Sequence, residues 1–245
     1  MGNNIIKLNK EYKNFFVQIL QNGLDRFKEH ELINKTVTNI GSMGTKWDMI
    51  NSEFKEALDK SIFDTVICKR GIWEFLLIYD KLNNTLYTLM KDKRFEDLVK
   101  TVKSDKVHYL EALTTVNISL CNEEREQMTF LENLTKEKEE KIEKTVEELF
   151  KDIDGNIDRH ILIRFTDKDF ELYSISASIV TPALDVLMKE DWAEYIQPKY
   201  TLEINDNDLL CDEEDIDLSL KEISNDIIIN EIKIKKISKE RNNIR

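Results

Sequence analysis

Positively charged side chains gather at the two ends of the stretch CKRGIWEFLLIYDKLNNTLYTLMKDKRF, residues 68–95. Five cations stand there, two beside Gly71 and three after the second apolar run: Lys69, Arg70, Lys91, Lys93 and Arg94. Neighbouring lysine and arginine side chains can hold a phosphate or the carboxylate of a partner. A solvated turn and an ordinary helix surface carry the same residue types, so this alternative stays open. We treat the five cations as a candidate binding surface.

Two further residues, Trp73 and Glu74, follow the first pair of cations and belong to the same candidate surface. Basic residues continue beyond it, since residues 91–106 hold six cations against four acids. A nucleic-acid-binding face would add aromatic rings for base stacking, and Phe95 or Tyr109 could supply them. This stretch is therefore a hypothetical nucleic-acid interface, with ordinary helix-surface charge as the alternative.

Residues suited to metal chemistry do not form a recognisable set. A metal-dependent nuclease needs an acid and an acid-x-Lys triplet on neighbouring strands. Asp64 and Glu74 stand near the right strands, but Phe75 and Leu76 follow Glu74, so the triplet is missing. His30, His108 and His160 have no ligand spacing. The sequence therefore predicts no catalytic residue, no metal site and no cofactor.

The three cysteines, Cys68, Cys121 and Cys211, are far apart and form no CxxC pair. Their usage is typical of a reducing cytoplasm, and no stretch is apolar enough to be a secretory signal or a membrane span. We therefore expect a cytoplasmic protein with no membrane partner. Cys68 stands beside two cations, which can lower the pKa of a thiol. The alternative is a buried strand cysteine.

Two glycines mark the stretch NIGSMGTKWDMINSEF, which we interpret as a loop that enters a helix near Trp47. Backbone amides at Gly41 and Gly44 could approach an anion in such a loop. The spacing matches neither a P-loop nor GxGxxG, so the sequence gives little support to a phosphate site there.

Hydrophobic periodicity predicts an α+β fold, in which short antiparallel hairpins are packed by helices and one long charged helix. Helices are expected at residues 10–30, 47–60, 95–102, 106–116 and 123–153. Strands are expected at residues 63–69, 72–79, 85–90, 160–165 and 170–180, and residues 183–196 are expected to form a strand and then a short helix. We divide the chain into residues 1–122, residues 123–200 and an acidic linker with an Ile/Lys-rich tail at 201–245.

Net charge differs sharply between the two halves of the chain. The first 122 residues hold 18 Lys and Arg against 16 Asp and Glu, whereas residues 123–245 hold 18 against 32. The acidic half argues against a nucleic-acid-binding surface that covers the whole protein. The most acidic run is the second candidate binding surface: Asp212, Glu213, Glu214 and Asp215.

Five motifs occur in one order along the chain: KRGIWEFLLIYDK, TLYTLMKDKRF, VHYLEAL, RHILIRF and KEDW. In these motifs the sequence resembles a family of uncharacterised bacterial and phage-borne proteins, over roughly residues 38–196. The resemblance implies a cytosolic protein of bacteria or their mobile elements. It implies no established activity and no catalytic residue.

These features favour a non-enzymatic regulatory or host-interaction protein that binds another protein, with an antitoxin-like or anti-defence role. The acidic second half and the absent catalytic motifs support this hypothesis. The alternative is a nucleic-acid-binding protein or nuclease that uses the basic hairpin at residues 69–106. The oligomeric state is left open.

Overall fold

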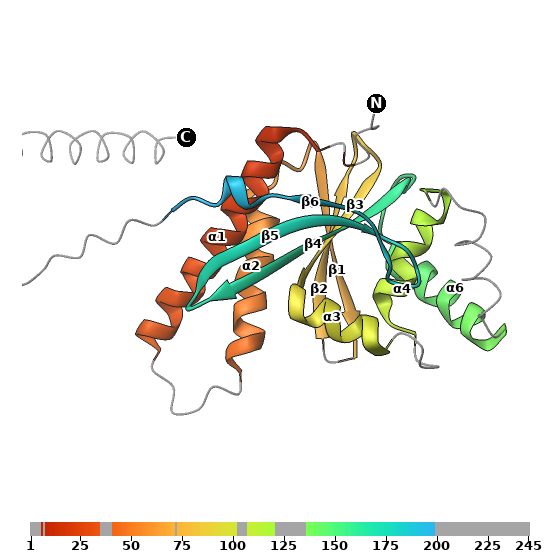
Figure 1. Ribbon diagram of the computed structural model, residues 1–245, viewed down its shortest axis with the longest axis horizontal. Coiled ribbons are helices and arrows are strands. Elements are labelled where there is room, and N and C mark those ends of the chain that lie inside the picture. The colour runs from red at the N-terminus through yellow and green to blue at the C-terminus, as the bar shows by residue number, and fades with distance from the viewer. Residues whose placement is uncertain are drawn as a thin grey trace, which may run out of the picture. The chain divides into compact units, whose positions relative to one another are not determined.

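The computed structural model describes residues 6, 8–34, 41–71, 73–101, 107–120 and 136–198. They form one six-stranded sheet with helices on both of its faces (Figure 1), so the predicted α+β class is confirmed. The strands are β1 Phe63–Arg70, β2 Trp73–Asp80, β3 Thr85–Lys91, β4 Arg159–Lys168, β5 Glu171–Val180 and β6 Val186–Asp191. The α-helices are α1 Lys10–Ile33, α2 Ser42–Ala57, α3 Asp92–Thr101, α4 Tyr109–Leu113 and α6 Lys136–Phe150. Two short 3₁₀ helices accompany them, η1 Thr114–Leu120 and η2 Ala193–Tyr195.

The sheet joins two antiparallel meanders through one parallel pair of strands. Its order follows the chain from β1 to β6, and every neighbouring pair is antiparallel except β3 and β4. A parallel pair needs a long crossover, which here contains α3, α4, η1 and α6. Sequence patterns predicted the separate hairpins, but they did not predict that the hairpins share one sheet.

Helix α1 forms as its sequence predicts and continues three residues beyond the expected end. Asn9 caps it, since its side-chain oxygen accepts a hydrogen bond of 2.8 Å from the backbone N–H of Tyr12. Its apolar side packs against α2, and Gly23 allows a very close approach. A Cβ atom placed on Gly23 would lie 2.8 Å from the Cα atom of Ile50.

Helix α2 begins earlier than predicted, at Ser42 and not near Trp47. The backbone N–H of Thr45 donates to the carbonyl oxygen of Gly41 at 3.0 Å, so Gly44 lies in the first turn of a helix. The predicted loop is therefore shorter than expected, because residues 42–46 are already helical, and the anion-binding role of Gly41 and Gly44 stays a prediction. The rest of that predicted loop, residues 39–40, lies outside the described residues.

The other predicted elements match the structure with shifted ends. The helix expected at 106–116 is observed as α4 followed by η1, and the hydroxyl of Thr114 at their junction donates to the carbonyl oxygens of Leu110 and Glu111. Of the long helix at 123–153, the structure gives α6, and residues 121–135 lie outside the described part. No helix within the described ranges is long and apolar enough to cross a membrane.

The largest hydrophobic core lies between α1, α2 and one face of the sheet. Phe16 is fully buried there, and its ring meets three others at centroid distances of 5.5–5.7 Å, those of Phe54, Phe63 and Tyr87. Two smaller clusters fill the opposite face under α3, α4 and α6. Helices thus cover both faces of the sheet.

Strands β2 and β3 pair at one end and separate at the other. Their paired residues are Ile78 with Tyr87, Tyr79 with Leu86, and Asp80 with Thr85. β1 and β2 pair along their whole length, and all of β3 pairs with residues 159–165 of β4. We call the separated parts, residues 73–77 of β2 and 88–91 of β3, the fork. The predicted turn closes the other end, where Asp80 accepts hydrogen bonds from the backbone N–H groups of Leu82 and Asn83.

Candidate functional site

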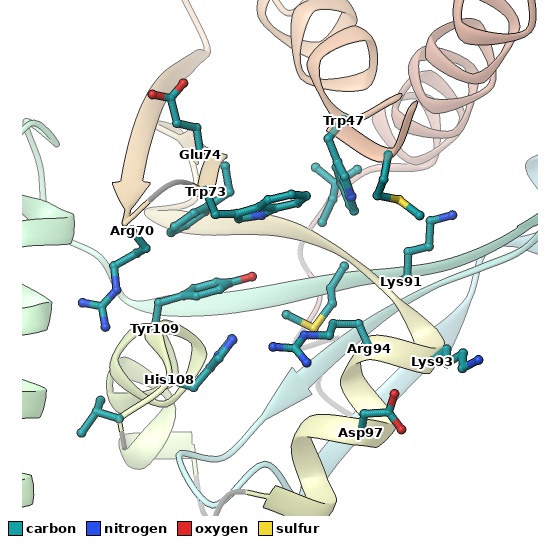
Figure 2. Close-up of a pocket in the computed structure, with 15 residues that line it drawn as sticks. Trp47, Arg70, Trp73, Glu74, Lys91, Lys93, Arg94, Asp97, His108 and Tyr109 are labelled. Carbon is teal, nitrogen blue, oxygen red and sulfur yellow. The ribbon is translucent and has the colours of Figure 1, made fainter. Parts of the chain in front are cut away.

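A cavity of about 610 Å³ lies at the fork, between the N-terminal part of α2 on one face of the sheet and α3 and α4 on the other (Figure 2). Its lining combines aromatic, aliphatic and charged side chains: Met43, Trp47, Arg70, Trp73, Glu74, Phe75, Leu89, Met90, Lys91, Lys93, Arg94, Asp97, Val107, His108 and Tyr109. Both separated strands contribute to it. The cavity therefore lies where β2 and β3 separate.

Aromatic rings form one wall of the cavity. Tyr109 stacks on Phe75 with 4.3 Å between the ring centroids and 25° between the planes, and the ring of His108 lies 4.3 Å from Tyr109. Figure 2 shows Trp73 and Tyr109 bordering the same space, with Trp47 entering from α2. Trp73 is 41% exposed, although it is a large apolar side chain. Burial raises the pKa of Tyr109 to about 12, so its hydroxyl stays protonated and can donate a hydrogen bond at neutral pH.

His108 brings a neutral hydrogen-bond donor to this wall. It caps α4, because its Nδ1 accepts the backbone N–H of Leu110 at 3.1 Å while Glu111 accepts the N–H of His108 at 2.9 Å. Burial first, and then the charges of Arg94 and Arg70, lower the pKa of His108 to about 4. The ring is therefore neutral at pH 7, and with Nδ1 as acceptor its proton lies on Nε2.

The cations around the cavity have different surroundings. Figure 2 shows Arg94 extending toward Tyr109 and His108, whereas Lys93 points away from the rings. Within the described part of the chain, no hydrogen bond or ion pair holds the Arg94 guanidinium. Arg70 instead contacts α6, where its Nη1 lies 3.4 Å from the hydroxyl of Thr145. Arg94 is thus the cation best placed to meet an anionic ligand.

A buried carboxylate, that of Asp167, binds the cavity-lining Lys91 and a second lysine, Lys46. The side chain of Asp167 is 3% exposed, and it accepts from Lys46 at 2.8 Å and from Lys91. Burial would raise the pKa of Asp167, but the hydrogen bonds from both lysines bring it below its ordinary value. Burial lowers the pKa of Lys91, partly opposed by Asp167. Two ammonium groups share one carboxylate, so this cluster keeps an excess of positive charge.

A scan against family models matches residues 5–244 to a family of unknown function, DUF5986. The chain belongs to the DUF5986 family. This agrees with the expected membership of an uncharacterised family. The match also includes the tail beyond residue 200, which the shared motifs did not cover. No curated protein and no solved structure matches the chain.

In this DUF5986 protein, six residues of the predicted surface line one cavity: Arg70, Trp73, Glu74, Lys91, Lys93 and Arg94. Lys69 does not line it, because it points to the surface and forms an ion pair of 3.3 Å with Glu74. The acidic candidates Asp212, Glu213, Glu214 and Asp215 lie outside the described residues.

Aromatic candidates divide into one that lines the cavity and one that does not. Tyr109 lines it, as the stacking hypothesis requires. Phe95 is 3% exposed and packs in the core on the inner side of α3, with Arg164 over its ring at 4.7 Å, so its proposed role in base stacking is wrong. Sequence reasoning missed Trp47 and His108 as lining residues. A histidine three residues before Glu111 was a signal for a capping position, but no signal indicated the cavity.

Other sequence hypotheses for the DUF5986 chain fail on geometry. Cys68 is buried on β1, and burial raises the pKa of its thiol to about 11, so a thiolate lowered by neighbouring cations is wrong. Asp64 and Glu74 lie toward opposite ends of the β1–β2 hairpin, where they pair with Lys81 and Lys69. Among the described residues, no three or more potential ligands gather as a metal site would require.

Proposed function

We propose that the cavity binds single-stranded nucleic acid, with an unpaired base against the aromatic wall and a phosphate at Arg94. The convergence of rings and cations in one hollow supports this proposal. Stacking of a base on an aromatic side chain contributes about 1–3 kcal/mol and tolerates different sequences. The cavity volume falls within the range of about 300–1,000 Å³ that is usual for small-ligand sites, so one nucleotide unit can enter it.

The net charge of the chain is consistent with a nucleic acid that contacts the protein only at the cavity, and not along an extended surface. The chain has a net charge of −12, which repels a nucleic acid over most of the surface. Few phosphates can then be neutralised, and the salt dependence of binding should be shallow, because its slope is proportional to the number of phosphate contacts. A base inside a duplex cannot reach the stacked wall. We therefore expect a preference for single strands.

Replacing Arg94 by glutamate should weaken binding of a labelled single-stranded oligonucleotide by about tenfold or more, since a charge-assisted hydrogen bond is lost and a like charge replaces it. Fluorescence anisotropy at low ionic strength measures this with DNA and RNA oligonucleotides. Lys100→Glu is the matched control, because it makes the same charge change on α3 at a residue that does not line the cavity.

Lys100→Glu should change the affinity far less than Arg94→Glu does, and circular dichroism should show both variants folded. Equal losses would mean that only overall charge matters. Absence of binding to every single-stranded oligonucleotide by the unaltered protein would refute the proposal.

The expectation of a protein-binding regulator, antitoxin-like or anti-defence, stays a prediction. Its main support is the acidic segment at residues 203–217, which lies outside the described residues. A pull-down with and without nuclease treatment separates the two roles, because a bound protein partner would survive the treatment.

A further inference from the structure

The cavity lies where residues of β2 and β3 would pair if the two strands did not separate. If the β2–β3 register continued beyond Ile78 and Tyr87, the next pairs would be Leu77 with Thr88, Leu76 with Leu89, Phe75 with Met90 and Glu74 with Lys91. The lining includes both members of each of the last two pairs. The ligand space therefore lies between two strand edges.

Those edges carry backbone groups with a defined direction. Along a strand, alternate residues turn their N–H and C=O groups to opposite sides. β1 and β4 satisfy the outer sides of β2 and β3, so about half of the residues in the fork direct both groups into the gap. Backbone groups removed from water cost free energy unless a partner meets them. The backbone groups in the gap must therefore form hydrogen bonds with water or with a ligand that has donors and acceptors.

A nucleobase has the two properties that this space calls for, a flat face that stacks and an edge that forms hydrogen bonds. Its face can stack on Tyr109 or Trp73, and its edge carries in-plane donors and acceptors that can meet strand groups. Arg94 and the Nε2–H of His108 stand beside the same wall, where a phosphate attached to that base would be held.

Resting on the proposed binding of single strands, we propose that the fork reads the base through the backbone edges of β2 and β3. The site would then distinguish between the four bases, whereas stacking alone would hold any of them. An extended peptide is the competing occupant, since open strand edges also accept peptide strands. The guanidinium of Arg94, which no described residue holds by a hydrogen bond or ion pair, and the stacked aromatic wall favour the nucleotide. The fork also closes into paired strands at Ile78 and Tyr87.

The test uses the full chain with five single-stranded oligonucleotides of one length, four homopolymers and one abasic strand. Affinities come from anisotropy competition, and amide hydrogen exchange is followed with and without the tightest binder. We expect the best and the worst homopolymer to differ by about tenfold or more. The abasic strand should bind more weakly than all four. Exchange should slow at residues 73–77 and 88–91, while strand β5, which is paired on both sides by β4 and β6, stays unchanged as an internal control.

Each outcome separates the two proposals. Equal affinities for the four homopolymers with unchanged exchange in the fork would overturn base reading and leave single-strand binding intact. No binding of any oligonucleotide would defeat both. If an extended valine- and threonine-rich peptide slowed exchange in the fork and no oligonucleotide bound, the fork would be a site for a peptide strand.

Discussion

Replacement of Asp167 by alanine should lower the free energy of unfolding by about 3–5 kcal/mol, because Lys46 and Lys91 would lose the buried carboxylate that they share. Removing one partner of a buried ionic group costs more than the group itself contributes, since the remaining charge is left without compensation. The side chains of Lys46 and Lys91 are only 14% and 24% exposed, so water cannot fully replace Asp167. Chemical denaturation followed by circular dichroism measures the loss.

Two controls isolate the mechanism. Asp152→Ala removes a carboxylate that is exposed and lies 3.9 Å from Lys151, and it should change stability by less than about 1 kcal/mol. Combining Asp167→Ala with methionine at positions 46 and 91 should recover part of the loss, because no cation then remains uncompensated. An undiminished loss in that background would show that charge compensation is not the cause.

The Asp167 contribution should also depend on pH. Its folded pKa lies below the ordinary value, so its stabilisation is fully present above the unfolded pKa of about 3.9. The stabilisation is lost as the pH falls through the lower folded pKa. An Asp167→Asn variant should therefore show a smaller loss of stability on acidification than the unaltered chain does.

Replacement of Phe16 by alanine should cost about 3–5 kcal/mol of stability. The ring is fully buried and meets an aromatic ring from α2, from β1 and from β3, so the deletion leaves a cavity that these separate elements cannot close together. Ile33→Ala is the control on the same helix, since Ile33 is 79% exposed and should change stability by less than about 0.5 kcal/mol. A loss below about 1 kcal/mol for Phe16→Ala would mean that the core rearranges to fill the space.

Local patterns predicted most strands because each strand carries its own signal. The apolar run before Asp80 and the turn that Asp80 holds are both readable from neighbouring residues. The union of two meanders into one sheet depends on pairing between β3 and β4, which are remote in sequence. No short-range pattern encodes that contact.

The candidate site was predicted in part for the same reason. Arg70, Trp73 and Lys91 stand at strand ends within the meander of β1, β2 and β3, so their closeness could be predicted from the sequence. Trp47 comes from α2 and His108 from the crossover, and only tertiary packing brings them to the fork. Phe95 failed because of helix phase, since α3 turns Phe95 inward and places its neighbour Arg94 at the cavity.

The side chain of His108 caps a helix and also lines the cavity, where it can donate a hydrogen bond. A substitution at this position therefore affects both the helix and the lining of the cavity. Asparagine would retain an acceptor for the first turn of α4, but it would shorten the reach into the cavity and lose the ring that meets Tyr109. Protonation below about pH 4 would remove the Nδ1 acceptor and add a charge beside Arg94. In the proposed complex, the stability of α4 and the binding of the ligand thus depend on the same imidazole.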